Sequence, residues 1–361
     1  MKKLLLLLLL AFSCQLGFSQ TLDKAKLDSY IDALATNNKF MGSVAISKNG
    51  QVIYTKAVGF ADIAISKKPD ANSKYRIGSI SKTFTTTLVF KAVEEGKLTL
   101  DKTINSYFPT IKNADKITIG NLLNHRSGIH NFTNDESYTD WDNIAQTEAQ
   151  LIDIITKGGS DFEPNAKAEY SNSNFILLTF ILQKTYKKTY TELIDKYIIK
   201  PIGLKNTKVG GKINLAGNEV NSYTFKGKWV KEDETDMSIP LGAGAMVSTP
   251  SDLTKFIEAL FSGKLISQKS VDQMKSMTEG YGMGLFEMPF EDKMAYGHNG
   301  GIDGFVSRLG YFPEDKIAVA ITSNGLNYNT KDISTTILSA VYNKEYKIPD
   351  FTSVALNAAD L

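Results

Sequence analysis

Ser79 and Lys82 have the residue types and the spacing that nucleophilic catalysis requires, within the segment GSISK. The apolar residues that follow repeat at helical spacing as far as Gly96, so both side chains should lie on one face of a helix's first turn. A serine hydroxyl is a weak nucleophile until a base removes its proton, and a lysine can be that base where burial lowers its pKa. The alternative is a serine that caps the helix, followed by a solvated lysine.

Tyr170 and Asn172 lie in a polar loop that leads into a second predicted helix, 172–186. A tyrosine beside a lysine can pass on a proton, because an ammonium group favours the phenolate. An asparagine offers both a donor and an acceptor to a substrate amide. The alternative is an aromatic residue packed at a helix start, with the asparagine as the cap.

His298 lies among four glycines, Gly297, Gly300, Gly301 and Gly304, at the end of a predicted strand. So many glycines around one histidine indicate that the backbone approaches another part of the protein closely. The alternative is a glycine-rich turn with an exposed histidine.

The other two histidines, His125 and His130, are interpreted as structural. Their spacing fits no pair of metal ligands on a helix, and the chain has no H-E-x-x-H motif. The sequence therefore predicts neither a metal nor a cofactor.

The apolar pattern predicts strands at both ends of the chain and helices between them. A helix over 22–37 precedes strands over 42–47 and 51–58, which a hairpin turn joins, and a short strand over 75–77 leads to Ser79. Further helices are predicted over 117–125, 147–155, 172–186 and 190–199, and a surface hairpin over 226–229. Beyond 240, Ser251-Asp252 should cap a helix that ends at Gly263, followed by strands over 293–298, 304–312 and 316–323 and a helix over 332–342.

This order of elements predicts an α+β fold of three layers, α/β/α, in which helices flank an antiparallel sheet. The first two strands should pair with the last three. The predicted organisation is a signal peptide over 1–19, one domain over 20–345 and a C-terminal tail over 346–361. Within the domain, the α/β part covers about 22–97 and 241–345, and a mainly helical insertion covers about 98–240.

The N-terminal segment has the pattern of a secretory signal peptide. Lys2 and Lys3 precede an apolar run, 4–12, that is too short to span a bilayer, and small residues precede Gln20. We therefore expect a secreted or periplasmic protein. Lipid attachment at Cys14, the chain's single cysteine, is the alternative. No later apolar run reaches the length of a membrane span.

The overall composition is that of an ordinary globular protein, with 42% hydrophobic residues, 22% charged residues and a net charge of +2. No stripe of basic residues is present, so a nucleic-acid partner is not expected. We expect a monomer that acts on a small-molecule or peptide substrate.

The chain resembles the serine β-lactamase-related superfamily, the S-x-x-K acyl-enzymes that include penicillin-binding DD-peptidases, class C β-lactamases and related esterases. The order Ser-x-x-Lys, Tyr-x-Asn, His-x-Gly carries the resemblance, together with flanking stretches, over about residues 22–345. These stretches are ITIGNLLNHRSG (117–128), PIGLKNT (201–207), GAGAMVSTPSDL (242–253) and residues 297–312.

The resemblance implies catalytic roles for three residues. Ser79 would be the acylated nucleophile and Lys82 its general base. Tyr170 would relay the proton to the leaving group.

The resemblance also implies a substrate-binding set. Asn172 would hold the substrate amide, and His298 would replace the lysine of many β-lactamases. Gly300 and Gly301 would lie on a strand whose edge binds an extended acyl-peptide. The N–H groups of Ser79 and Gly301 would form the oxyanion hole.

We therefore predict a secreted serine hydrolase that forms an acyl-enzyme and acts on amides or esters as a D-amino-acid peptidase, carboxypeptidase or esterase. The alternatives are hydrolysis of β-lactams and a non-catalytic binding protein on the same fold. A Ser-His-Asp α/β-hydrolase would need G-x-S-x-G, which the chain lacks. With an ordinary pKa of about 6.5, His298 would gain charge as the pH falls and would then bind carboxylate substrates better.

Overall fold

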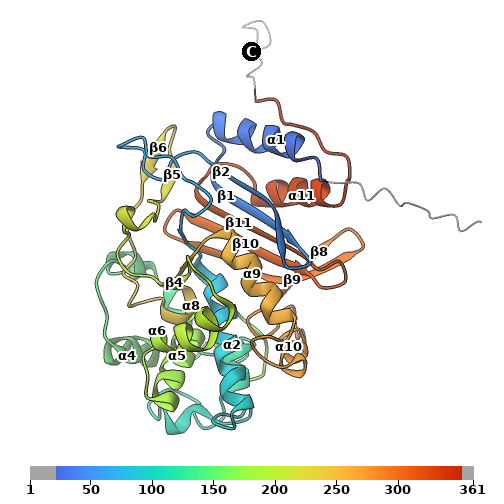
Figure 1. Cartoon of the computed structure of the whole chain (residues 1–361). Coiled ribbons are helices and arrows are strands. Elements are labelled where there is room, and N and C mark those ends of the chain that lie inside the picture. The colour runs from blue at the N-terminus through green and yellow to red at the C-terminus, as the bar shows by residue number, and fades with distance from the viewer. Residues whose placement is uncertain (1–21, 352–361) are drawn as a thin grey trace, which may run out of the picture.

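The computed structural model describes residues 22–351, which form a mainly antiparallel sheet covered by helices on both faces (Figure 1). The strand order is β2-β1-β11-β10-β9-β8, and the hairpin β5-β6 adds to β11. The strands are β1 Phe40–Lys48, β2 Gln51–Val58, β5 Tyr223–Phe225, β6 Trp229–Lys231, β8 Phe286–Phe290, β9 Lys293–Ile302, β10 Phe305–Phe312 and β11 Ile317–Leu326. The predicted α+β class and the hairpin at 226–229 are confirmed.

Strands from the two ends of the chain pair at the centre of the sheet. β1 lies between β2 and β11, with Ser43 opposite Thr322. The prediction that early strands pair with late ones is therefore confirmed.

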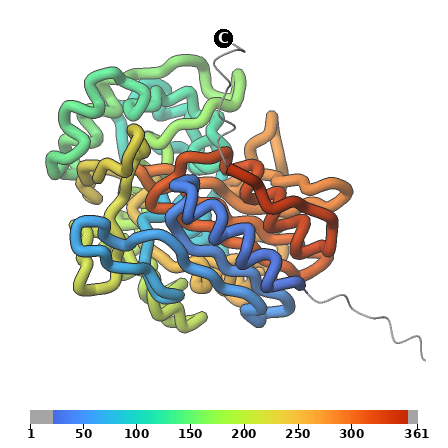
Figure 2. Tube along the Cα trace, turned by 90° about the horizontal axis from the view of Figure 1, so that it is seen from above, coloured from blue at the N-terminus to red at the C-terminus, as the bar shows by residue number. Residues whose placement is uncertain are grey.

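Helices α1 (Lys24–Thr36) and α11 (Thr330–Val341) lie across one face of the sheet (Figures 1 and 2). Alternation along β11 separates two cores: Ile317, Val319 and Ile321 belong to the core under these two helices, and Ala318 and Ala320 to the opposite one. The small alanines let α9 (Pro250–Phe261) pack close to the second face. Helix α9 in turn packs on α10 (Gln268–Met274).

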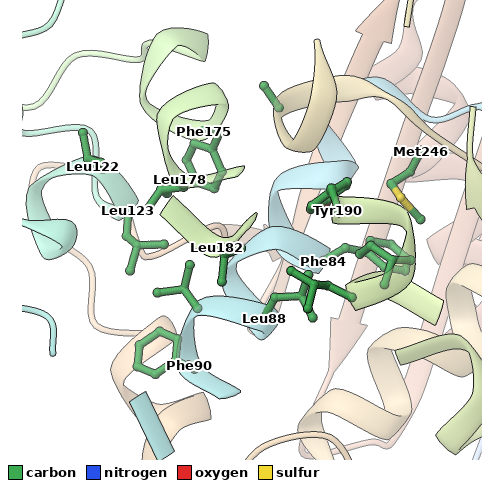
Figure 3. Close-up of a cluster of buried hydrophobic side chains, with 14 of the residues drawn as sticks. Phe84, Leu88, Phe90, Leu122, Leu123, Phe175, Leu178, Leu182, Tyr190 and Met246 are labelled. Carbon is green, nitrogen blue, oxygen red and sulfur yellow. The ribbon is translucent and has the colours of Figure 1, made fainter. Parts of the chain in front are cut away.

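The helical region packs against the second face of the sheet through α2 (Ser81–Glu94) and α5 (Asn172–Tyr186). Leu88 of α2 lies near Leu182 of α5, and both belong to one buried cluster with Phe175 and Leu178 (Figure 3). The other helices are α3 Ile119–Leu123, α4 Glu148–Gly158, α6 Tyr190–Ile194 and, after a π-helical turn over Asp195–Ile199, α7 Lys200–Ile202. Because α2 and α5 are buried on nearly all sides, they are rigid supports for the residues at their starts.

A small second sheet, in the order β3-β7-β4, was not predicted. It joins β3 (Tyr75–Arg76) to β7 (Met246–Ser248) and β4 (Lys208–Val209). Strand β7 follows the short helix α8 (Leu241–Gly244), so this sheet ties the backbone before Ser79 to the end of the predicted insertion.

Three further details differ from the sequence predictions. Strand β8 was missed because Pro289 lies within it, and an edge strand tolerates a proline that a central strand would not. The cap of α9 is Thr249, whose side chain accepts the N–H of Asp252, because Pro250 occupies the first helical position. The start of the predicted tail packs back on the domain, where Tyr346 meets Tyr30.

The predicted signal peptide, 1–19, lies outside the described residues. Among residues 22–351, no helix combines the length and the apolar character needed to cross a bilayer.

Candidate active site

Ser79 lies in a single 3₁₀ turn, Gly78–Ile80, directly before α2. Gly78 has a φ of +48°, and a Cβ there would lie 2.7 Å from the backbone nitrogen of Gly301. Ser81 fixes the turn from the other side, because its Oγ donates to Gly78 O (2.6 Å) and accepts the N–H of Met246 (3.0 Å). The nucleophile candidate is thus held between β9 and the segment that follows α8.

The Lys82 side chain is fully buried on the first turn of α2, beside Ser79. Its Nζ lies 3.0 Å from Ser79 Oγ, 2.7 Å from Asn172 Oδ1 and 2.8 Å from the carbonyl oxygen of Ala243. Burial lowers the pKa of Lys82 well below its ordinary value, and none of these contacts is a carboxylate that would offset the effect. The alternative of a solvated lysine is therefore wrong.

A neutral Lys82 amine has two N–H groups and one lone pair. Asn172 Oδ1 and Ala243 O can only accept, so they take both N–H groups. As an ammonium, Lys82 donates its third N–H to Ser79 Oγ (3.0 Å); once that proton has left, the lone pair lies on the side of the Ser79 hydroxyl. The geometry orients a base toward the serine proton before any substrate binds.

Asn172 is held in place by contacts that the sequence did not reveal. Its backbone N–H donates to Asn131 Oδ1 (2.9 Å), and its Nδ2 donates to Thr133 Oγ1 (2.9 Å). Its side-chain oxygen is occupied by Lys82, so contact with a substrate amide stays a prediction, through the nitrogen only. Neither Asn131, Thr133 nor Ala243 had a pattern in the sequence that would have singled it out.

Tyr170 lies just before α5, and its hydroxyl forms a hydrogen bond with the Ser79 side chain. The ring stacks on His125 at 4.5 Å between centroids, and the N–H of Ser171 donates to His125 Nδ1 (3.1 Å). Burial raises the pKa of Tyr170, and only the bond to Ser79 opposes that rise. The expectation that Lys82 favours a phenolate is therefore wrong, because burial disfavours both charged forms.

His298 and the glycines after it lie on β9, against the Ser79 turn. A Cβ at Gly300 would lie 2.1 Å from the carbonyl oxygen of Ile77, so the expected close approach of backbone is confirmed. The imidazole is only 3% exposed, beside the ring of Phe286, so the alternative of an exposed histidine is wrong. Its Nδ1 hydrogen-bonds to the carbonyl oxygen of Asn299.

Burial, reinforced by nearby Lys82, lowers the pKa of His298 to about 3. The expectation of an imidazole that titrates near neutral pH and then binds carboxylates is therefore wrong. The imidazole of His298 is therefore neutral near neutral pH.

A cavity of about 570 Å³ opens beside Ser79, in the size range of small-ligand sites. Asn172 and Gly301 also line it, whereas Lys82, Tyr170, His298 and Gly300 do not. Its remaining wall combines apolar side chains, Phe132, Tyr138, Ile176, Ile239, Pro240 and Ile302, with polar ones from the loops at 133–143 and 224–235 and from Asp303. The structure thus places Ser79 between a buried base and a substrate-sized space.

The chain is similar to several known proteins in sequence and in structure. A putative penicillin-binding protein of Bacillus subtilis, PbpX, is 28% identical over 333 residues, which cover 91% of this chain and 79% of that protein. A teichoic acid D-alanine hydrolase of Staphylococcus aureus is 25% identical, covering 84% and 74%.

Solved structures of known proteins are also similar to this chain. A D-amino acid amidase from Ochrobactrum anthropi SV3 is 27% identical with a TM-score of 0.76, covering 89% of this chain and 99% of that one. A D-stereospecific amidohydrolase from Streptomyces sp. is 26% identical with a TM-score of 0.77, covering 90% and 100%. The family described as Beta-lactamase matches residues 27–344, so the chain belongs to that family and is a serine hydrolase.

Proposed function

We propose that the protein hydrolyses amides or esters of D-amino acids through an acyl-enzyme on Ser79. The observation that carries this proposal is the fully buried Lys82, whose Nζ lies 3.0 Å from Ser79 Oγ and whose pKa is lowered by burial. The names of the relatives support the substrate class, because two of the proteins compared act on D-amino-acid amides or D-alanyl groups.

In the proposed reaction, Ser79 Oγ attacks the carbonyl carbon while its proton moves to Lys82 Nζ. The N–H groups of Ser79 and Gly301 stabilise the oxyanion that forms, because Gly301 lies against the Ser79 turn. Tyr170, whose hydroxyl bonds to Ser79, gives its proton to the leaving group and regains one from Lys82. Water then releases the acyl group by the reverse sequence of proton transfers.

Efficient hydrolysis of β-lactams is the second candidate, and the environment of His298 argues against it. A permanent ammonium at this position would attract the carboxylate of a β-lactam, whereas a buried neutral imidazole has no charge to offer. We therefore favour amidase or esterase activity over β-lactamase or carboxypeptidase activity.

Intact-mass spectrometry tests the proposal after exposure to a fluorophosphonate, a penicillin and a short peptide that ends in D-Ala-D-Ala. The wild-type protein should gain the mass of one fluorophosphonate adduct, and Ser79→Ala should gain none. Ser339→Ala is the control, because Ser339 is a buried serine of α11, on the opposite face of the sheet, and bonds to a backbone oxygen. Labelling of Ser79→Ala at wild-type level would overturn the assignment.

We also propose that the protein is exported and acts as a monomer. The signal-peptide pattern at residues 1–19 supports export. The native protein should begin near Gln20, as N-terminal sequencing would show, and should sediment as a single chain. Lipid on Cys14, or a stable oligomer at micromolar concentration, would contradict these proposals.

A further inference from the structure

Carboxylates form part of the wall of the cavity beside Ser79. Asp142 follows the 3₁₀ turn Glu136–Asp140, and Glu232 and Asp233 follow β6. The N–H of Asp236 donates to the backbone oxygen of Asp142 (2.8 Å), which ties the two segments together. Two loops far apart in sequence thus bring their acidic side chains to one cavity.

A fourth carboxylate, Asp303, forms an ion pair with Arg76 and has a structural role. Its Oδ2 accepts from Arg76 at 2.8 Å, and its Oδ1 accepts from the N–H (3.0 Å) and the hydroxyl (2.7 Å) of Thr235. These bonds hold the 232–235 segment against the turn between β9 and β10. Asp303 therefore fixes the position of the acidic wall.

The other three carboxylates have no cationic partner in the described part of the chain. Among residues 22–351, neither Asp142, Glu232 nor Asp233 forms an ion pair, and no lysine or arginine lines the cavity. Burial raises the pKa of Asp142, and the negative charges of Asp303 and Asp233 raise it further. Three negative charges that lie near one another without a counter-ion make binding of a cationic group in the cavity favourable.

We propose that Asp142 and Asp233 select acyl donors that carry a free ammonium group. The proposal rests on the function proposed above and narrows its substrate class to unblocked D-aminoacyl amides and esters, whose α-amino group is protonated near neutral pH. An N-acylated peptide has no cation to place against this wall, and the carboxylate of a β-lactam meets repulsion there. The apolar residues of the same cavity, such as Phe132 and Ile239, suit a small hydrocarbon side chain.

The test compares two anilides that differ only at the amine, D-alanine p-nitroanilide and N-acetyl-D-alanine p-nitroanilide. The measured quantity is the ratio of their kcat/KM values, compared between proteins, so that the different intrinsic reactivities of the anilides cancel. The double variant Asp142→Asn/Asp233→Asn should lower this ratio by about tenfold, mainly through KM for the unblocked anilide. Asp140→Asn is the matched control, because Asp140 is exposed on the same loop and does not line the cavity. It should leave the ratio unchanged.

Salt supplies a second measurement that needs no variant. Raising NaCl from about 0.01 M to about 1 M shortens the Debye length from about 30 Å to about 3 Å, so the wild-type ratio should fall. The inference would be overturned if the double variant kept the wild-type ratio of kcat/KM values, or if Asp140→Asn lowered that ratio as much as the double variant does. It would also be overturned if the wild-type ratio did not depend on salt. If a fluorophosphonate still labels Ser79 in that case, the proposed function stands without the inference. Failure to label Ser79 and to cleave either anilide would overturn both.

Discussion

Replacing Asn172 by aspartate should convert Lys82 from a base into an ammonium ion. Asn172 Oδ1 lies 2.7 Å from Nζ, and burial without an anionic partner lowers the pKa of Lys82. A carboxylate at that distance would attract the ammonium form by about 6 kcal/mol at an effective dielectric constant of about 20. Desolvation of the new carboxylate offsets part of this attraction. If about 3 kcal/mol of the attraction remains, the fraction of Lys82 that is neutral at a given pH falls roughly 10²-fold.

The assay is kcat/KM for an uncharged ester, p-nitrophenyl acetate, measured from about pH 5 to about pH 10. Lys82 must be neutral to accept the proton of Ser79, so wild-type activity is present above the pKa of Lys82 and is lost below it. In Asn172→Asp the acid limb should move to higher pH, and activity near pH 7 should drop about 10²-fold. Asn172→Leu has a similar volume and removes the acceptor without adding charge. It should lower activity but should not move the acid limb to higher pH.

An acid limb at the same pH in Asn172→Asp and in the wild type would refute this reasoning. It would mean that the protonation of Lys82 does not limit acylation, even if the overall rate fell. Circular dichroism and thermal unfolding of both variants control for loss of fold.

Tyr170→Phe and Lys82→Ala should each lower turnover by about 10²-fold or more, and the double variant should lose little beyond the worse single one, because both residues move the same proton. Strictly additive losses would contradict shared proton transfer. The two aspartates that flank His130 raise its pKa, so its contribution to stability is complete below the unfolded pKa of about 6.5 and is lost as pH rises through the folded pKa. Urea unfolding should show that loss in the wild type and not in His130→Gln; matching pH profiles would argue against it. Gly300→Ala should destabilise the protein by about 1–3 kcal/mol, because its Cβ would lie 2.1 Å from Ile77 O. An unchanged Tm would contradict the tight packing of β9 on the Ser79 turn.

Local patterns sufficed for much of the fold. Helix α5 has the predicted bounds, 172–186, because its apolar run and its start are encoded in adjacent residues. The pairing of early with late strands also followed from the order of the elements. Strand β8 could not be predicted, because its proline is tolerated only at the edge of a sheet, and the position of an edge is a tertiary property.

The candidate site was predictable in its residue types but not in its charges. Sequence spacing placed Lys82 near Ser79. One of the acceptors that orient the Lys82 amine is the backbone carbonyl oxygen of Ala243. Because every residue has such an oxygen, the sequence could not indicate which one Lys82 contacts. His298 is buried partly by Phe286, a residue of the strand that the sequence did not indicate, so its neutral state could not be foreseen. The acidic wall of the cavity depends on two loops that meet only in the folded protein.

The position of β11 has a consequence for how this enzyme is made. This strand, the last of the sheet to be synthesised, lies between β1 and β10, and Thr322 bonds to the backbone of Ser43, 279 residues earlier. Chains grow at about 5–20 residues per second, so many seconds pass between the synthesis of β1 and that of its partner strand β11. Pairing across such a long sequence separation is also intrinsically slow. The nucleophile is therefore translated early but stays inert until the last strands arrive, and a chain that terminates before β11 should be a target for proteases rather than a partly active hydrolase.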